Sequence, residues 1–451
     1  MIQVVKFGTP DYRKALARLR NRFGAQVEEA AEHARERSMQ VFGEPLGPLE
    51  AVRRILSDVR RMGDAAVALY TEKFDGCRLR PQEFRVPQSQ IEASAGQVSA
   101  EWLRAAQAAK DNIYQYHRNL RERPPREIVQ GDRALMARSA PLGSAGLYVP
   151  GGLAPYPSTV LMTAVPAQAA GVRQLVLCTP PRRDGGVAPE ILAAAMSCGI
   201  TEVYRVGGVQ AIGALAYGTE SIPRVEKIVG PGNLYVQLAK KEVFGVVGID
   251  QFAGPSEILV VADETANAAW VAADMLSQAE HAPDASAILV TPQATLVEGV
   301  VAELEKQVVM LPRGAIARES LRRYGLAVIA ESVDACIAVA EEIAPEHLEL
   351  HVRDAESHAS RITRAGAVFV GPYTPEVVGD YLAGPSHVLP TGGTARFFSG
   401  LSVQDFQRHW AIISYSRQAL REAQQALRVL AEMEGLDAHA RSARVRFPER
   451  S

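Results

Sequence analysis

The chain has few cysteines, and no two of them form a motif. Its 451 residues include four, Cys77, Cys178, Cys198 and Cys336, without any C-x-x-C spacing. This scatter argues against a disulfide framework and against a thiolate zinc site. Cys178 lies in a strand-like run, and Cys198 and Cys336 lie in helix-like runs. We therefore expect buried, inert thiols.

A basic excess, a long apolar run and a secretion signal are also missing. The formal net charge is -2, which argues against a nucleic-acid partner. The most apolar stretch, Val160 to Cys178, is broken by Pro166 and several polar residues, so it is not expected to span a bilayer. The segment Met1 to Lys6 lacks the basic-then-apolar order of a signal peptide. We expect a cytoplasmic protein with no membrane partner.

No segment completes the G-x-G-x-x-G or P-loop fingerprint of nucleotide-binding proteins. Glycine-rich turns nevertheless follow three strand-like runs, at Gly146–Gly152, Gly207–Gln210 and Gly230–Asn233. Glycine lets backbone amides approach a phosphate, although turns need glycine for conformational reasons as well. With Tyr148, Gln210 and Asn233 at their edges, the three turns together favour a nucleotide in this part of the chain.

Length and composition indicate an ordinary globular protein with more than one core. At 451 residues, 47% hydrophobic and 22% charged, the chain suggests roughly two to four domains. Residues 11 to about 120 place apolar side chains at helical intervals and charged ones on the opposite faces. This part of the sequence predicts a helical scaffold.

From Pro141 onward, strand-like runs alternate with helical runs, the pattern of βαβ units in a mostly parallel sheet. The first series of strands is predicted at Gln174–Cys178, Glu202–Val206 and Val225–Val229. The second is predicted at Glu257–Ala262, Ala287–Thr291, Leu326–Ile329 and Ala367–Val370. A loop over 371–400 precedes a charged helical tail, Arg417–Met433. Because this tail has little apolar surface of its own, a partner subunit is a candidate for what it packs on.

The stretch Ser277-Gln278-Ala279-Glu280-His281 ends a helical run that starts near Asn267. Gln278 and His281 are three residues apart, so an amide oxygen and an imidazole nitrogen share one helix face. Their position between two strand-like runs is where open α/β sheets place ligand crevices. One interpretation is a metal or polar substrate. The other is a chance pair on a helix surface, since Gln is an uncommon metal ligand.

Three further polar positions could take part in chemistry. Glu346-His347 precedes the predicted strand His347–Val352 and could transfer protons, although a His near a helix C-terminus is the alternative interpretation. Asp380 follows the strand ending at Val370, on the edge where such sheets bind ligands. His439 in the tail, preceded by Glu434, reads by itself as a surface residue.

Taken in order, these motifs resemble those of the histidinol dehydrogenase family. The likeness extends from about Val52 to His439, and the ordered set is highly specific. The matching segments are Gly230-Pro231-Gly232-Asn233, Ala253-Gly254-Pro255-Ser256-Glu257, Ser277-Gln278-Ala279-Glu280-His281 and Pro345-Glu346-His347-Leu348.

The resemblance implies an NAD-dependent oxidation of L-histidinol to L-histidine, the last step of histidine biosynthesis. It implies two hydride transfers through an enzyme-held L-histidinaldehyde. It also implies one zinc ion per subunit, held by Gln278, His281, Asp380 and His439, with the last supplied by the other subunit of a homodimer with swapped C-terminal tails. The metal would anchor the substrate against the nicotinamide rather than activate water.

Individual roles follow from the same resemblance. His347 would take the hydroxyl proton in the first oxidation, and Glu346 would activate water for the second. The NAD contacts implied are Tyr148, Gln210 and Asn233. The substrate contacts implied are Ser256, Gln278, His281, His347, Asp380, Glu434 and His439.

The fold class that the resemblance implies is α/β, with two incomplete Rossmann-like doubly wound domains and helical N-terminal and C-terminal extensions. Residues 1–45 are expected to form an N-terminal helical segment. Residues 46–140 and 250–395 would form a Rossmann-like domain carrying the metal and catalytic residues. Residues 141–249 would form the NAD-binding domain, and 396–451 the swapped tail.

Two other functions compete with this one. A related zinc-dependent dehydrogenase could act on another small polar alcohol or diol, because substrate contacts can change on one scaffold. The presence of Ser256, Asp380, Glu434 and His439 argues against it. A non-enzymatic nucleotide-binding protein is the other reading, and the Glu346-His347 pair argues against that.

Overall fold

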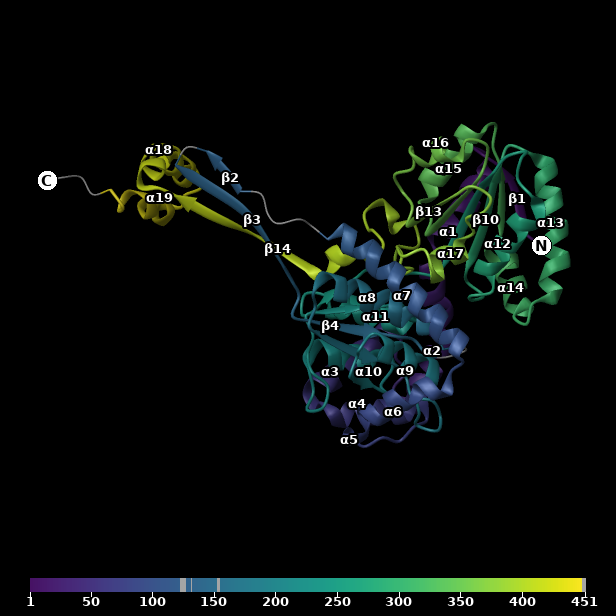
Figure 1. Ribbon diagram of the computed structural model, residues 1–451, viewed down its shortest axis with the longest axis horizontal. Helices are drawn as coiled ribbons and strands as arrows, with labels where there is room; N and C mark the ends of the chain where they lie inside the picture. Colours follow the sequence, from purple (N-terminus) through teal and green to yellow (C-terminus); the bar gives the residue numbers. More distant parts are fainter. Residues whose placement is uncertain (122–126, 131, 152–154, 448–451) are drawn as a thin grey trace. The chain divides into compact units, whose positions relative to one another are not determined.

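The computed structural model describes residues 1–121, 127–130, 132–151 and 155–447 (Figure 1). The chain forms two compact units. The first contains Met1–Leu120 and Leu142–Phe406, and the second contains Arg121–Pro141 and Gln407–Ser451. Gly152 of the first predicted turn and the last four residues of the predicted tail lie outside the described residues.

A six-stranded sheet forms one half of the first unit, and every pairing in it is parallel. Its central strands are nearly continuous runs of apolar residues, as expected for strands covered on both faces. In spatial order the strands are β1 (Gln3–Lys6), β11 (Leu326–Ile329), β10 (Ser286–Thr291), β9 (Glu257–Ala262), β12 (His347–His351) and β13 (Ala367–Val370).

Helices cover both faces of this sheet, so two hydrophobic cores form. One core contains side chains of α1 (Pro10–Arg20), α15 (Val333–Ile343) and α16 (Ala355–Ala359). The other contains side chains of α12 (Ala268–Ala279), α13 (Ala294–Gln307) and α14 (Gly314–Tyr324). The short helix α17 (Glu376–Tyr381) follows β13. This is the doubly wound arrangement predicted for the second series of strands.

The other half of the first unit is a five-stranded sheet, again parallel throughout. Its order is β6 (Glu202–Tyr204), β5 (Gln174–Cys178), β4 (Ser144–Tyr148), β7 (Lys227–Val229) and β8 (Gly248–Ile249). One face packs on α7 (Ala100–Leu120), α8 (Pro157–Ala170) and α9 (Pro189–Ser197). The opposite face packs on α3 (Pro48–Met62), α4 (Asp64–Asp75), α10 (Gly208–Tyr217) and α11 (Leu234–Val243).

The packing of residues 46–120 differs from the expected domain grouping. Residues 46–140 were expected to share a domain with 250–395. Instead Val52, Ile55 and Val67 of α3 and α4 are buried in the core of the five-stranded sheet. Ile113 of α7 joins that sheet's other core. The helical pattern predicted the helices correctly, but it does not specify which of two apolar sheets each helix covers.

The N-terminal segment is not purely helical. Strand β1 pairs with β11 at the edge of the six-stranded sheet. Tyr12, Leu16 and Leu19 of α1 then pack in that sheet's core. The long helix α2 (Arg22–Phe42) follows and ends at Gly43, whose φ of 77° is left-handed. Residues 1–45 therefore belong to the first unit rather than forming an extension.

The second unit combines a three-stranded antiparallel sheet with two helices. Its order is β14 (Gln407–Tyr415), β3 (Arg133–Pro141) and β2 (Glu127–Gln130). The helices are α18 (Arg417–Met433) and α19 (Asp437–Arg444). The helical tail was predicted, but β14 was not. Most of its residues are exposed, so no alternation between a buried and an exposed face marks it as a strand.

The strands predicted in the two series agree closely with the observed ones, but β4 was not among them. Gly146–Tyr148 were predicted as the start of a glycine-rich turn and instead belong to β4, a strand whose five residues are all buried. Every strand predicted in the two series is present, with bounds shifted by at most a few residues. The predicted loop over 371–400 is an exception, because it contains α17. The remaining short helices of the described residues are α5 (Pro81–Phe84) and α6 (Gln88–Ala93), with 3-10 turns at Ser94–Gln97, Val308–Met310, Thr394–Arg396 and Val403–Phe406.

The described helices and the cysteines agree with the expectations of no membrane-spanning segment and of buried thiols. Among the described helices, none combines the length and apolar character needed to cross a bilayer. All four cysteines are buried, free thiols, as predicted. Burial raises the pKa of Cys198 to about 11 and that of Cys336 to about 12, so both thiols stay protonated at neutral pH.

Candidate active site

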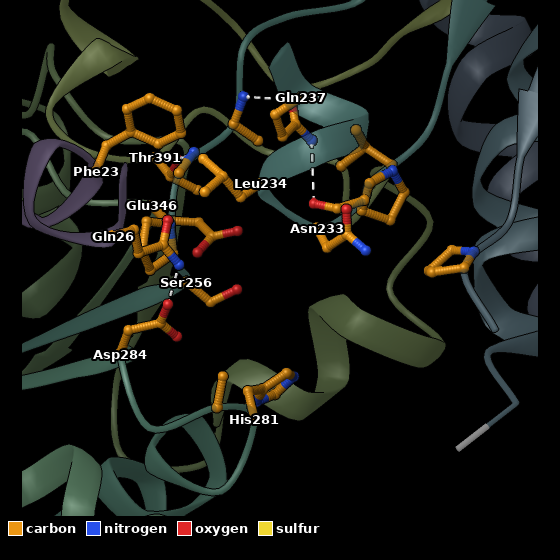
Figure 2. Close-up of a pocket in the computed structure, with 18 of the residues that line it drawn as sticks. Phe23, Gln26, Asn233, Leu234, Gln237, Ser256, His281, Asp284, Glu346 and Thr391 are labelled. Atoms are coloured by element: carbon orange, nitrogen blue, oxygen red, sulfur yellow. Dashed lines mark hydrogen bonds between the residues drawn. The ribbon is translucent and has the colours of Figure 1, made fainter. Parts of the chain in front are cut away.

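A cavity of about 910 Å³ in the first unit brings together most of the polar residues that the sequence singled out. Figure 2 shows Glu346, Ser256 and His281 around one open space, with Asn233 on another side of it. Helix α2, the Gly230–Asn233 turn, the end of α12 and helix α17 contribute to the wall. The predicted residues that line it are Asn233, Ser256, Gln278, His281, Glu346, His347 and Asp380.

The cavity lies at the amino-terminal edge of the six-stranded sheet, not at the carboxyl edge that the sequence predicted. Ser256 immediately precedes β9, and Glu346 immediately precedes β12. Because α12 and α17 follow strands β9 and β13 and run back along the sheet, their C-terminal residues reach this edge. The five-stranded sheet does follow the usual rule, since its turn at Gly230 comes after β7.

Glu346 is a buried carboxylate beside the first residue of β9. Its Oε2 accepts a hydrogen bond of 2.9 Å from the backbone N–H of Glu257. Burial raises the pKa of Glu346 well above its usual value, and the neighbouring carboxylates of Glu257, Asp380 and Glu376 raise it further. A carboxylate in this environment is a stronger base than a solvent-exposed one.

His347 is held with one ring nitrogen free. Its Nδ1 lies 2.9 Å from Oε1 of Gln278 and 3.1 Å from the backbone oxygen of Glu257. Both oxygens can only accept, so Nδ1 carries the hydrogen and Nε2 keeps its lone pair. Nε2 has no hydrogen-bond partner among the described residues and lies 3.8 Å from Oδ1 of Asp380. Burial lowers the pKa of His347, which favours the neutral ring.

Gln278 and His281 do meet at the end of α12, as their spacing predicted. The Nδ1 of His281 lies 3.0 Å from the backbone oxygen of Ser277, so it donates there and leaves Nε2 as a lone-pair donor. Gln278 is fully buried, with its Nε2 3.4 Å from Nδ1 of His281. The side chains of this pair line the cavity rather than an exposed helix surface.

The side chains of Gln278, His281 and Asp380 offer the nitrogen and oxygen atoms that fit a divalent metal ion. His281 is held as metal-ligating histidines usually are, with Nδ1 bonded to a backbone oxygen and Nε2 available. Ligand atoms of His347, Glu376 and Asp380 lie within 4.8 Å of one another, and Asp380 is the one proposed metal ligand in this group. Asp380 thus faces the imidazole of His347 from α17, and its backbone oxygen accepts from Nδ1 of His387 at 3.2 Å.

A second cavity, of about 530 Å³, opens beside the first and is lined by the three predicted nucleotide contacts, Tyr148, Gln210 and Asn233. Asn233 and Tyr235 line both cavities, so the two adjoin. Gln210 is buried, and both its amide oxygen and its nitrogen lack a partner among the described residues. An unpaired buried amide is costly unless a ligand satisfies it.

Tyr148 and Asn233 also have structural roles. The hydroxyl oxygen of Tyr148 accepts from the backbone N–H of Gly208 at 3.1 Å. Oδ1 of Asn233 accepts from the N–H of Val236 at 3.1 Å and caps helix α11. At Gly230 the φ is 118°, and a Cβ there would collide with the backbone oxygen of Tyr148, so this turn requires glycine for its own geometry.

Glu434 and His439 lie in the second unit. Glu434 is the C-cap residue of α18, and His439 is on α19. Together with apolar residues such as Leu430, they line a groove of about 360 Å³ between these helices.

Comparison with known proteins identifies the family. The family model described as histidinol dehydrogenase matches residues 47–447. Histidinol dehydrogenase from Bacillus cereus is 50% identical over 398 residues, covering 88% of this chain and 92% of that protein. The enzyme from Moorella thermoacetica is 51% identical over 400 residues, covering 89% and 94%.

The chain belongs to the histidinol dehydrogenase family. The resemblance inferred from the motifs is thereby confirmed, and so is its assignment to the oxidoreductases of histidine biosynthesis. The crystal structure of histidinol dehydrogenase from Elizabethkingia anophelis has a TM-score of 0.84 to this chain at 39% identity, covering 88% of this chain and 91% of that one. The α/β fold class is confirmed as well.

Some lining residues of this histidinol dehydrogenase fold were not found from the sequence. Phe23 and Gln26 of α2 line the main cavity, although the sequence predicts a helical scaffold over residues 11 to about 120. Both residues precede the family match, which begins at residue 47. His387, also in the wall, lies in the predicted loop. A helical polar face carries no signal for which of its residues will face a cavity, because that depends on how α2 docks.

Proposed function

We propose that this chain oxidises L-histidinol to L-histidine with NAD, through an enzyme-held L-histidinaldehyde and two hydride transfers. One observation carries the proposal. A neutral His347 with a free Nε2 and a buried, basic Glu346 line the same cavity as the nitrogen and oxygen donors Gln278, His281 and Asp380.

The proposed first step uses His347 as the base. The lone pair on Nε2 would accept the proton of the substrate hydroxyl as the carbinol is oxidised to the aldehyde. The hydrogen bonds from Nδ1 to Gln278 and to the backbone oxygen of Glu257 hold the ring in place and stabilise the imidazolium that forms. When bound, NAD supplies the hydride acceptor in both oxidations.

In the proposed second step Glu346 is the base. Its carboxylate removes a proton from the water that adds to the aldehyde carbon, which gives the hydrate whose carbon then loses the second hydride. The raised pKa of Glu346 supports this role. A thiohemiacetal route would need an activated thiolate, and the buried, protonated cysteines do not offer one.

The proposed metal site contains Gln278, His281, Asp380 and, from the other subunit, His439, with one zinc ion per subunit. A bound zinc would supply a fixed anchor for the substrate. Ser256, Glu434 and His439 are the remaining proposed substrate contacts. The adjoining cavity lined by Tyr148, Gln210 and Asn233 supports NAD binding there. In this scheme residues 250–395 carry the metal and catalytic residues, and 141–249 bind NAD.

The substrate is tested by steady-state NADH formation with purified protein. We expect L-histidinol to be preferred over other amino alcohols and over diols, with two NADH formed per L-histidine. The second candidate, a related dehydrogenase of another small polar alcohol or diol, predicts no preference for histidinol. That outcome would remove the assignment of the substrate.

We further propose a homodimer in which each C-terminal tail completes the partner's site. The tail was expected to have little apolar surface, but Leu430 and Met433 of α18 are exposed, as is Ile413 of β14. These exposed apolar residues support a partner surface. Mixing inactive His439→Ala and His347→Ala subunits should then restore part of the activity in heterodimers, because one of the two sites is intact. No recovery, with subunit exchange demonstrated by mass spectrometry, would contradict the swapped arrangement.

A further inference from the structure

Strand β12 carries a polar face that is buried inside the first unit. His347, Glu349 and His351 alternate with Leu348 and Leu350, and all five are buried. Since alternate residues of a strand face opposite sides, the leucines join the hydrophobic core on one side. The three polar side chains face the other side, where α12 and α17 provide their partners.

Glu349 holds the start of helix α17. Its side chain is 0% exposed, and its Oε1 accepts a hydrogen bond of 2.6 Å from the backbone N–H of Glu376, the first residue of that helix. The first-turn N–H groups of a helix have no partner within the helix, so a carboxylate there fixes its start. Asp380 lies four residues further on. Because both residues lie on α17, the bond that holds Glu376 also fixes the position of Asp380.

The side chain of Glu376 continues the connection to α12. Its Oε2 accepts a hydrogen bond of 2.7 Å from Oγ of Ser277. Ser277 immediately precedes Gln278 on α12. Two carboxylates and one hydroxyl thus join the three elements that carry His347, Gln278 and Asp380.

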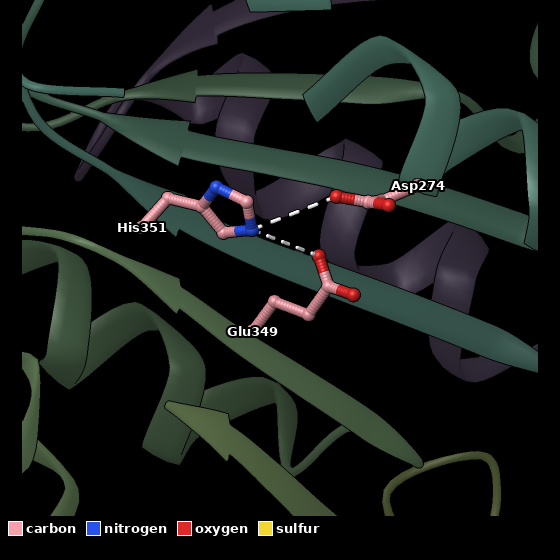
Figure 3. A group of neighbouring side chains, drawn as sticks. All are labelled: Asp274, Glu349 and His351. Atoms are coloured by element: carbon pink, nitrogen blue, oxygen red, sulfur yellow. Dashed lines mark ion pairs between the residues drawn. The ribbon is translucent and has the colours of Figure 1, made fainter. Parts of the chain in front are cut away.

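The second oxygen of Glu349 lies beside an imidazole ring. Figure 3 shows the ring of His351 directed at Glu349 and at Asp274, with its Nε2 3.3 Å from Oε2 of Glu349 and 3.5 Å from Oδ2 of Asp274. His351 is buried as well. The ring of His351 and the carboxylate of Asp274 pack beside the second oxygen of Glu349 and limit where its side chain can lie.

We propose that Glu349 is a positioning residue of the metal site: it fixes α17, and through Glu376 and Ser277 it sets the separation of Asp380 from Gln278 and His281. This inference rests on the proposed function, because it assumes that these residues bind zinc. Glu349 itself touches neither metal nor substrate. Residues that orient metal ligands in this way typically contribute about 10- to 100-fold to metal affinity.

The test measures the Zn²⁺ affinity of the metal-free protein by competition with a chromophoric chelator. Glu349→Ala should weaken binding by about 10- to 100-fold. Glu349→Gln keeps an oxygen that can accept from the N–H of Glu376, so it should recover most of the affinity. Ser277→Ala removes the link between Glu376 and α12, together with a hydrogen bond to the backbone oxygen of Asp274, and leaves the bond from Glu349 to α17 in place. It should weaken binding less, and it covers the case in which Glu349→Ala does not fold.

Glu341→Ala is the matched control. Glu341 also accepts a backbone hydrogen bond in the same half of the unit, from the N–H of Thr363 at 2.7 Å, but it connects no ligand-bearing element. Its Zn²⁺ affinity should match wild type. In steady-state assays Glu349→Ala should raise KM for histidinol more than Glu341→Ala does, because the zinc anchors the substrate.

Several results would overturn the role of Glu349. These are unchanged Zn²⁺ affinity in both Glu349→Ala and Ser277→Ala, equal weakening in Glu341→Ala, or no recovery in Glu349→Gln. The ligand atoms of Asp274, Glu349 and His351 also lie within 4.8 Å of one another. If wild type binds a second metal equivalent per chain and Glu349→Ala loses it, Glu349 is a metal ligand instead. A wild-type protein that binds no Zn²⁺ would overturn the proposed metal site and this role together.

Discussion

Replacing Arg22 with methionine would break a buried ion pair directly beneath the candidate site. The guanidinium bonds to the carboxylate of Glu257, with the two side chains 2% and 5% exposed. It also donates to the backbone oxygens of Leu19, Ser256 and Asp284, each at 3.2 Å. The backbone of Glu257 in turn holds Glu346 and His347. Arg22→Met should therefore affect both stability and the site.

The expected loss in the free energy of unfolding follows from the unpaired carboxylate of Glu257 that Arg22→Met leaves behind. Removing one partner of a buried pair typically costs about 3–5 kcal/mol. Without the guanidinium, the buried carboxylate of Glu257 would be protonated in the folded state. At pH 7 that protonation costs at most about 4 kcal/mol relative to an unfolded pKa of about 4.3. Burial already raises the pKa of Glu257 in the wild type, in the same direction.

The destabilisation of Arg22→Met relative to wild type should depend on pH. In the variant the folded state binds more protons than the unfolded state between pH 4.3 and 7, so its stability rises as the pH falls. In the wild type the ion pair weakens as Glu257 takes up a proton. The difference in stability between the two proteins should therefore be largest near pH 7 and should shrink toward pH 5.

Urea unfolding followed by circular dichroism measures these differences, and Arg20→Met is the matched control. Arg20 pairs with Glu342 at 3.5 Å, but the two side chains are 46% and 42% exposed. Exposed pairs contribute about 0–1 kcal/mol. A loss in Arg22→Met no larger than in Arg20→Met would refute the reasoning. So would a difference from wild type that grows as the pH falls.

Two further predictions concern buried groups without partners in the described part of the chain. His117 is 0% exposed, and burial lowers its pKa to about 4. Because the pKa of an unfolded histidine is about 6.5, the unfolded state binds more protons between these two values. The free energy of unfolding should therefore fall by about 2 kcal/mol as the pH falls from 6.5 to 5. His117→Leu should abolish that loss in urea titrations, and an equally acid-sensitive variant would contradict the assignment. Gln210→Ala should raise the Kd for NADH, measured by fluorescence, by about tenfold, because the ligand loses its bonds to the buried amide; an unchanged Kd would show that the nucleotide lies elsewhere.

The strand His347–His351 illustrates how far sequence reasoning extends. Its alternation of polar and apolar residues predicts a strand, and the strand is present. Alternation ordinarily marks one face as solvent-exposed, yet both faces are buried here. Glu349 consequently gave no functional signal in the sequence. A buried carboxylate becomes recognisable only when its partners, such as the N–H of Glu376, are known.

The position of the site could not be predicted in the same way. The sequence indicated the carboxyl edge of the sheet, because ligands usually bind there in open α/β folds. The structure instead brings Glu346 and Ser256 together at the amino edge. Residues just before a strand and residues at the end of the preceding helix both lie at the amino edge of a parallel sheet. The sequence therefore contained the position of the site, although the rule that ligands bind at the carboxyl edge indicated the other side.

By itself, the sequence determined the local structure and the family. Hydrophobic periods set the strands and helices, and the ordered motifs around Gly230, Gln278 and His347 identified the histidinol dehydrogenases. Tertiary structure alone decided which side chains meet. The bond from the N–H of Glu257 to Glu346 joins residues 89 apart, and that from Ser277 to Glu376 joins residues 99 apart. Such contacts depend on how helices dock on sheets, which local periodicity does not encode.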